Sequence, residues 1–239
     1  MKKVLKGLIT AIVVIISLVL VLSYFLPEDN ILKKGINIIT YEIKYIFKKS
    51  VDVPIEYTLK DNNNNGIADP IDIVNGAREE AENKTDYQSN YYSGGYPPEG
   101  EGVCTDVIWR GIINAGIDLK ELMDEDIRNN INLYPRTEGK PDPNIDFRRV
   151  VNQDIFFQRF CEVLSTELIS EDVENLVNWQ PGDIVVFLDS TEHVGVISDK
   201  RDKEGIPYII HNSPPHAREE KLARLITNMK ITGHYRWRY

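Results

Sequence analysis

The chain has only two cysteines, Cys104 and Cys161, among its 239 residues. Two cysteines are too few for the disulfide framework that stabilises small secreted domains. The sequence also lacks the C-x-x-C and H-E-x-x-H spacings of common zinc sites, which argues against a zinc enzyme. Composition is otherwise that of an ordinary globular protein with a good-sized core.

A basic stripe is missing from most of the chain. Residues 1–50 hold eight lysines and three acidic residues, a net charge of +5, whereas the remainder holds 20 basic and 34 acidic residues, a net charge of −14. Nucleic-acid binding needs clustered Lys and Arg side chains that neutralise phosphates. We therefore expect no nucleic-acid partner.

The N-terminal segment has one long uncharged run, LITAIVVIISLVLVLSYFL at 8–26, which follows Lys2, Lys3 and Lys6. As a helix, 19 residues span roughly 28 Å, close to a hydrocarbon core. Neither an A-x-A-like cleavage site nor a lipoprotein cysteine follows the run, which favours a signal anchor over a cleaved signal peptide. Residues 1–30 are thus predicted to form a cytoplasmic tip and a single transmembrane helix, with the rest of the chain extracellular.

Residues 31–60 are predicted to be a basic juxtamembrane linker. Isoleucines and lysines alternate over 31–50, so an amphipathic segment lying on anionic lipid is an equally good interpretation. The lysines on this side of the apolar run weaken the signal for its orientation.

Residues 61–72, DNNNNGIADPID, match the EF-hand type of calcium loop. The predicted ligands are Asp61, Asn63, Asn65, the backbone carbonyl of Ile67, Asp69 and Asp72. Gly66 stands at the sharp turn, and Pro70 suits the start of an exiting helix over 70–83. The last position is Asp where Glu is usual, and an Asn-rich polar turn is the alternative interpretation. Segment 61–83 is predicted to hold a structural Ca²⁺ ion.

After a loop over 84–101, the sequence GVCTDVIWRGIINAG at 102–116 has helical apolar periodicity. This pattern puts Cys104 at a helix N-terminus, where free N–H groups and the helix dipole favour a thiolate. Gly116 suits the end of the helix. Cys161 stands in an amphipathic helix and is predicted to be buried packing.

Two histidines stand in predicted strands. His193 begins a strand that follows the strand Ile184–Leu188, and His211 and Asn212 end the strand PYIIHNS at 207–213. Adjacent strands would place the two imidazoles together, so that one takes the thiol proton and the other orients it. Asn212 is the alternative orienting residue.

The order of these motifs resembles the NlpC-like cell-wall peptidases of the papain superfamily. More closely, GVCTDV, NIDFRRV, PGDIVVF, HVGVISD and ITGHYR resemble a bacterial branch of that superfamily, a domain of unknown function. The resemblance implies an α+β domain over 84–239, with a cysteine-bearing helix packed on a small antiparallel sheet. It further implies Cys104 as nucleophile, His193 as base and His211 as orienting residue, with no catalytic cofactor.

Four weaker candidates surround this triad. Arg148 and Arg149 present planar forks suited to a substrate carboxylate, or they form ion pairs within an acidic domain. Asp106 replaces a small residue beside the nucleophile, and it either lines the site or pairs with Arg110 four residues on. Tyr96 is a possible oxyanion donor beside the backbone N–H groups near Cys104.

Together these features predict a cell-surface, single-pass membrane enzyme that hydrolyses an amide bond in peptidoglycan stem peptides. A catalytically silent wall-binding or scaffold domain is the alternative from another class. Acyl transfer, which some members of the superfamily perform, is the third possibility.

Overall fold

The computed structural model describes residues 27, 30–31, 45 and 48–238. The chain divides into two compact units, 1–49 and 50–239, and the second carries every element discussed below. The predicted transmembrane helix and half of the predicted linker lie outside the described residues. Within the described part of the chain, no helix is both long enough and apolar enough to cross a membrane.

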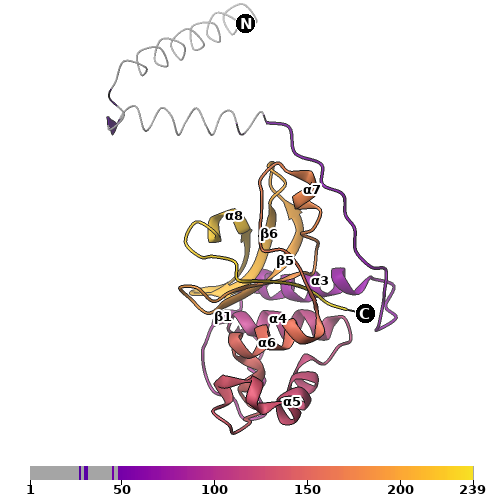
Figure 1. The fold of residues 1–239 in the computed structure, drawn as a ribbon, viewed down its shortest axis with the longest axis vertical. Coiled ribbons are helices and arrows are strands. Elements are labelled where there is room, and N and C mark those ends of the chain that lie inside the picture. Colours follow the sequence, from indigo (N-terminus) through magenta and orange to yellow (C-terminus); the bar gives the residue numbers. More distant parts are fainter. Residues whose placement is uncertain (1–26, 28–29, 32–44, 46–47, 239) are drawn as a thin grey trace, which may run out of the picture. The chain divides into compact units, whose positions relative to one another are not determined.

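Helices and short turns of the second unit pack on both faces of its sheet. They are α3 (Asp69–Glu82), α4 (Cys104–Asn114), α5 (Leu119–Asn129), α6 (Val150–Phe160), α7 (Val173–Leu176) and α8 (Leu222–Leu225), with 3₁₀ turns at Ile131–Leu133, Pro135–Thr137 and Asp146–Arg148. Figure 1 shows α3 and α4 side by side against the sheet. Glycines allow this approach, because a Cβ at Gly76 would lie 2.8 Å from the carbonyl oxygen of Arg110.

Eight strands form one curled mixed sheet. They are β1 (Asp86–Tyr87), β2 (Glu101–Gly102), β3 (Glu162–Val163), β4 (Ile184–Phe187), β5 (His193–Arg201), β6 (Pro207–Ser213), β7 (His216–Lys221) and β8 (Gly233–Arg236). Their order is β2-β1-β7-β6-β5-β4-β8-β3, antiparallel except for the parallel pair β1–β2. The α+β class is confirmed. The sheet is larger than predicted, because two-residue strands show no periodicity in sequence.

Both faces of the central strands are buried. Val194, Val196 and Ile210 pack on one face with residues of α3 and α4, in a cluster that includes Cys104. Ile197 and Ile209 belong to a second cluster. Strands covered on both faces are apolar throughout, which explains the continuous hydrophobic run of β4.

The last part of the predicted linker belongs to the second unit and packs within it. The backbone N–H of Glu56 donates to Oε1 of Gln180 at 2.8 Å, and Nε2 of Gln180 donates to the carbonyl of Pro54 at 3.1 Å. Val53 is buried in the second apolar cluster. The compact unit therefore begins before the calcium-loop motif.

Candidate active site

Cys104 is the first residue of α4, as the sequence predicts. Asp106 stabilises this start, because its Oδ2 accepts a hydrogen bond from the backbone N–H of Val103 at 2.7 Å. Helix α4 ends at Asn114, and Gly116 follows with a φ of +76°. A positive φ is the conformation that glycine adopts most easily after a helix.

The sulfur of Cys104 lies against the start of β5. Backbone N–H groups of Val194, Thr105 and Cys104 itself are directed at it and lower the pKa of the thiol. Burial has the larger effect and raises that pKa to about 12, since the residue is only 6% exposed. The helix N-terminus therefore does not produce a thiolate in the resting protein as the sequence suggested; the resting thiol is protonated.

The two predicted histidines lie together. Nε2 of His193 is 2.8 Å from Nδ1 of His211, and the two ring planes are almost perpendicular, at 89°. Both residues are buried, at 6% and 2% exposure. The sulfur of Cys104 thus meets the backbone N–H of Val194, the residue that follows His193 in β5.

A carboxylate that the sequence analysis missed continues this pair. Oε1 of Glu220 lies 3.0 Å from Nε2 of His211 and also accepts a hydrogen bond from Nε of Arg218 at 2.7 Å. The hydrogen bond from His211 is the largest cause that lowers the pKa of Glu220 to about 2. Glu220 is therefore ionised at neutral pH. Its position on β7, diagonally across from His211, depends on strand register.

The ionised carboxylate dictates the tautomers of both imidazoles. Glu220 can only accept, so Nε2 of His211 carries a proton and Nδ1 of His211 holds a lone pair. That lone pair accepts from Nε2–H of His193, which leaves Nδ1 of His193 unprotonated. The chain of three residues thus supplies a base whose free nitrogen is the one not bound to His211.

His193 is neutral in the resting protein. Burial is the main cause that lowers its pKa to about 3, and the charges of His211 and Arg218 add to this effect. Burial thus disfavours the charged form of both His193 and Cys104. An imidazolium–thiolate pair would let each charge stabilise the other, so proton transfer is favoured only as a concerted step.

Tyr87 of β1 is a second residue that the sequence analysis missed. Burial, followed by the charges of Cys104 and Asp106, raises the pKa of its phenol. The phenol is therefore protonated at neutral pH and close enough to Cys104 to sense its charge. Tyr96, the predicted oxyanion donor, instead packs on Trp109 and Phe147 with ring centroids 4.9 and 5.6 Å away.

Comparison with known proteins places these residues in a defined family. Residues 74–237 match the family described as "Domain of unknown function (DUF1287)". The chain belongs to this family. It is also 33% identical over 210 residues to "Uncharacterized protein YijF" of Escherichia coli strain K12, an alignment that covers 84% of this chain and 95% of that protein. No solved structure matches the chain.

The DUF1287 match includes Cys104, both histidines of the pair and Glu220, whereas the calcium-loop motif at 61–72 precedes it. The candidate active site therefore lies wholly inside the family domain.

Asp106 and Arg148, predicted as weak substrate-binding residues, form a buried ion pair within this domain. Nε and Nη2 of Arg148 donate to the two carboxylate oxygens of Asp106 at 2.7 and 2.8 Å, and the side chains are 2% and 1% exposed. Nη1 of Arg148 donates to the carbonyl of Asn90 at 2.8 Å. These contacts hold the segment before Cys104 on α4. Arg110 pairs with Glu80 instead of Asp106.

Arg149 and Asn212 have separate surroundings. The Arg149 side chain is 33% exposed and lies 3.8 Å from Asp146, so it retains free surface. Nδ2 of Asn212 donates to the carbonyls of Thr85 and Gly102 at 3.2 and 3.1 Å. Asn212 therefore fastens the strands β1 and β2, and His211 occupies the orienting position.

The remaining cysteine and histidines have structural surroundings. Cys161 is 1% exposed in the core, as predicted. His234 is fully buried, with Nε2 3.1 Å from Oδ2 of Asp183 and Nδ1 2.8 Å from the carbonyl of Ser165. These contacts satisfy both ring nitrogens, so His234 is a structural residue.

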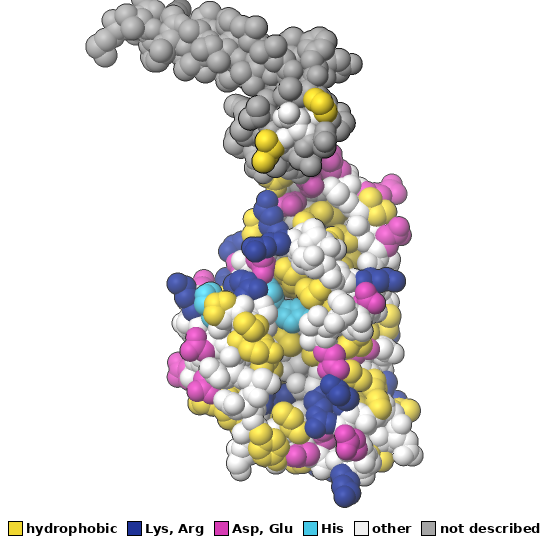
Figure 2. All heavy atoms as spheres, turned by 90° about the vertical axis from the view of Figure 1, so that its left-hand side faces the viewer, with side chains coloured by type: hydrophobic (Ala, Val, Ile, Leu, Met, Phe, Trp, Pro, Cys, Tyr) yellow, Lys and Arg dark blue, Asp and Glu magenta, His cyan; other side chains and the backbone are white. Residues whose placement is uncertain are grey.

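A hollow of about 270 Å³ opens beside the histidine pair. Its lining comprises Thr191, His193, His211, Ser213, Arg218, Glu220, Arg224, Leu225, Asn228 and Met229. Figure 2 shows histidine side chains at a hollow of this face, with Lys or Arg and hydrophobic side chains around it. A substrate therefore has a path to the imidazoles.

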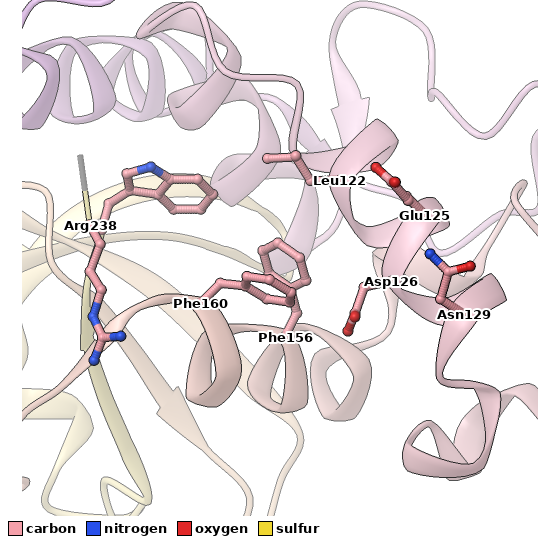
Figure 3. Close-up of a pocket in the computed structure, with 8 residues that line it drawn as sticks. Leu122, Glu125, Asp126, Asn129, Phe156, Phe160 and Arg238 are labelled. Carbon is pink, nitrogen blue, oxygen red and sulfur yellow. The ribbon is translucent and has the colours of Figure 1, made fainter.

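A second hollow, of about 410 Å³, lies between α5 and α6 (Figure 3). It is lined by Leu122, Glu125, Asp126, Asn129, Phe156, Phe160, Trp237 and Arg238. The Asp126 carboxylate is fully engaged, accepting from Arg159 at 2.8 and 2.9 Å and from Tyr134. No cysteine, serine or histidine lines this hollow, so it is a poor candidate for the catalytic site.

Proposed function

We propose that this protein is a papain-like cysteine peptidase or amidase that hydrolyses an amide bond in peptidoglycan stem peptides. The observation that carries the proposal is the chain His193–His211–Glu220 together with a cysteine at a helix N-terminus, whose sulfur meets the backbone N–H of Val194, the residue after His193. A buried carboxylate orients an imidazole in many enzymes with an activated nucleophile. The same chain here leaves a lone pair on His193.

The reaction would proceed in two halves. The sulfur of Cys104 attacks the carbonyl carbon of the scissile amide while Nδ1 of His193 takes the thiol proton. The imidazolium returns that proton to the leaving amine, which leaves a thioester on Cys104. Water, deprotonated by His193, then hydrolyses the thioester and restores the thiol.

Charge on the oxygen of the tetrahedral intermediate needs donors near Cys104. Backbone N–H groups at the start of α4 are available, and the protonated Tyr87 phenol lies in the same surroundings. Donors placed in a buried site stabilise a developing oxyanion strongly because little water screens them.

The substrate class and the location rest on the motif resemblance and on the N-terminal sequence. A signal anchor with an external catalytic domain would bring the site to the cell wall, and the membrane is the second partner that this proposal implies. The net negative charge of residues 51–239 agrees with the expectation that no nucleic acid is bound.

Two other functions use the same fold. A silent wall-binding or scaffold domain has no need for an ordered Cys, His, His and Glu arrangement, which is the observation against it. Acyl transfer shares the thioester and differs only in the acceptor, an amine in place of water. Adding an amine acceptor and searching for the transfer product separates transfer from hydrolysis.

The direct test is product analysis of purified peptidoglycan by mass spectrometry after incubation with the full chain. Cys104→Ala is the inactive variant, and Cys161→Ala is the matched control because Cys161 is buried away from the histidine pair. New peptide ends made by the wild type and Cys161→Ala, but not by Cys104→Ala, are expected. If no variant makes products, the binding-domain function replaces the enzyme.

A further inference from the structure

One carboxylate oxygen at the first residue of α3 has no partner. Asp69 is fully buried, and its Oδ1 accepts a hydrogen bond from the backbone N–H of Asn62 at 2.8 Å, while its Oδ2 has none. A buried carboxylate oxygen without a hydrogen bond is strongly destabilising unless a proton or a cation compensates it.

Two further carboxylates make a proton or cation more necessary. Asp61 and Asp72 carry these carboxylates. Asp72 is itself only 1% exposed. The motif thus places a second buried carboxylate, that of Asp72, in the same first turn of α3 as Asp69.

We propose that residues 61–72 bind a Ca²⁺ ion in the folded protein. Nδ2 of Asn63 and Nδ2 of Asn65 both donate to Oδ2 of Asp72, at 3.1 and 2.9 Å, so these three side chains already meet. Rotation of the two amides exchanges Nδ2 for Oδ1 and presents oxygen to an ion. The oxygen donors are then Asp61, Asn63, Asn65, Ile67 through its carbonyl, Asp69 and Asp72.

The donor types indicate calcium over other metals. Carboxylate, amide and carbonyl oxygens suit a hard cation, and a set of six or more protein oxygens suits Ca²⁺ better than Mg²⁺. Among the described residues, no three His, Cys, Asp or Glu side chains already stand together as a metal site. The ion would therefore draw the loop inward around amide and carbonyl oxygens, and its affinity belongs to the weak, extracellular range.

The ion would act on the helix that carries the nucleophile. Nδ2 of Asn114 donates to the carbonyl of Asp72 at 2.8 Å. Asn114 is the last residue of α4, and Asp72 lies in the first turn of α3. Calcium would therefore brace the start of α3 against the end of α4, whose opposite end bears Cys104.

The test is calcium titration of the full chain after removal of metals with a chelator. We expect calcium to raise Tm by about 3–6 °C at a tenfold excess over Kd, with a much smaller effect of Mg²⁺ at the same concentration. Asp61→Asn and Asp69→Asn should lose this response. Asp189→Asn, an exposed aspartate outside the loop, is the matched control and should keep it.

Calorimetric titration of the wild type gives an independent measurement if a loop variant fails to fold. The proposal is wrong if calcium up to about 10 mM produces neither binding heat nor a Tm shift. It is equally wrong if both loop variants respond like Asp189→Asn. Cys104→Ala should bind calcium normally, so this result is separate from the result of the peptidase assay.

Discussion

Nε2 of His193 lies 2.8 Å from Nδ1 of His211, and the outer nitrogen of His211 lies 3.0 Å from Glu220. Because the carboxylate only accepts hydrogen bonds, this geometry fixes the protonated nitrogen of each imidazole. The base therefore depends on a residue two side chains away from it. This dependence distinguishes an ordered hydrogen-bonded chain from two histidines that merely pack together.

Glu220→Gln should lower kcat/KM roughly 10- to 1,000-fold, because an amide can also donate and no longer enforces one tautomer. Loss of the negative charge should also lower the pKa of the His193 base. The acidic limb of the pH–rate profile should then move to lower pH. Steady-state kinetics over a pH range that extends below the His193 pKa of about 3 measure both effects.

The matched control for that variant is Glu219→Gln. Glu219 is the preceding residue on β7, and it pairs with Arg78, Lys200 and Ser198, outside the histidine chain. Its variant should keep the wild-type acidic limb even if its stability falls. Equal shifts of the limb in both variants would contradict the role given to Glu220.

Alkylation of Cys104 should be slow at neutral pH in the absence of substrate. Its pKa is raised to about 12 by burial, so the labelling rate should rise about tenfold per pH unit from pH 7 to pH 9. Mass spectrometry after timed iodoacetamide treatment gives the rate for each cysteine. A plateau below pH 8 that disappears in His193→Gln would instead show a preformed thiolate–imidazolium pair.

Arg148→Met should destabilise the fold by about 3–5 kcal/mol, because it leaves the Asp106 carboxylate buried without its cation. Arg149→Met is the neighbouring control, and its cost should stay within about 1 kcal/mol, since Arg149 is partly exposed and only loosely paired. Urea unfolding of both variants measures the free energies. A similar small loss in both would show that the buried pair contributes little.

Stability should fall as the pH drops from 7 to 5, and His193 should account for part of the loss. Its folded pKa of about 3 lies below its ordinary value of 6.5. The unfolded chain therefore binds a proton first, so the stabilisation is complete above about pH 6.5 and is lost as the pH falls toward 3. At pH 5 the difference between wild type and His193→Gln should be smaller than at pH 7 by about 2 kcal/mol. Equal pH dependence of the two proteins in urea unfolding would contradict this.

Local sequence determined the elements that carry the main candidates. Helical periodicity after Gly102 and a glycine at 116 predicted α4 with Cys104 at its start. The pattern of 207–213 predicted β6 with the same bounds as in the structure. These predictions succeeded because propensity, periodicity and terminal residues act over neighbouring positions.

Only the tertiary structure decided which distant side chains meet. Glu220 reaches His211 through the register of β6 and β7, and Tyr87 reaches Cys104 through a two-residue strand without any sequence pattern. The protonation state of Cys104 also depends on burial, which the full packing determines and which outweighs the local effect of the helix end. Sequence thus determined the candidate residues, whereas long-range packing decided their partners, their charges and the tautomers that they adopt.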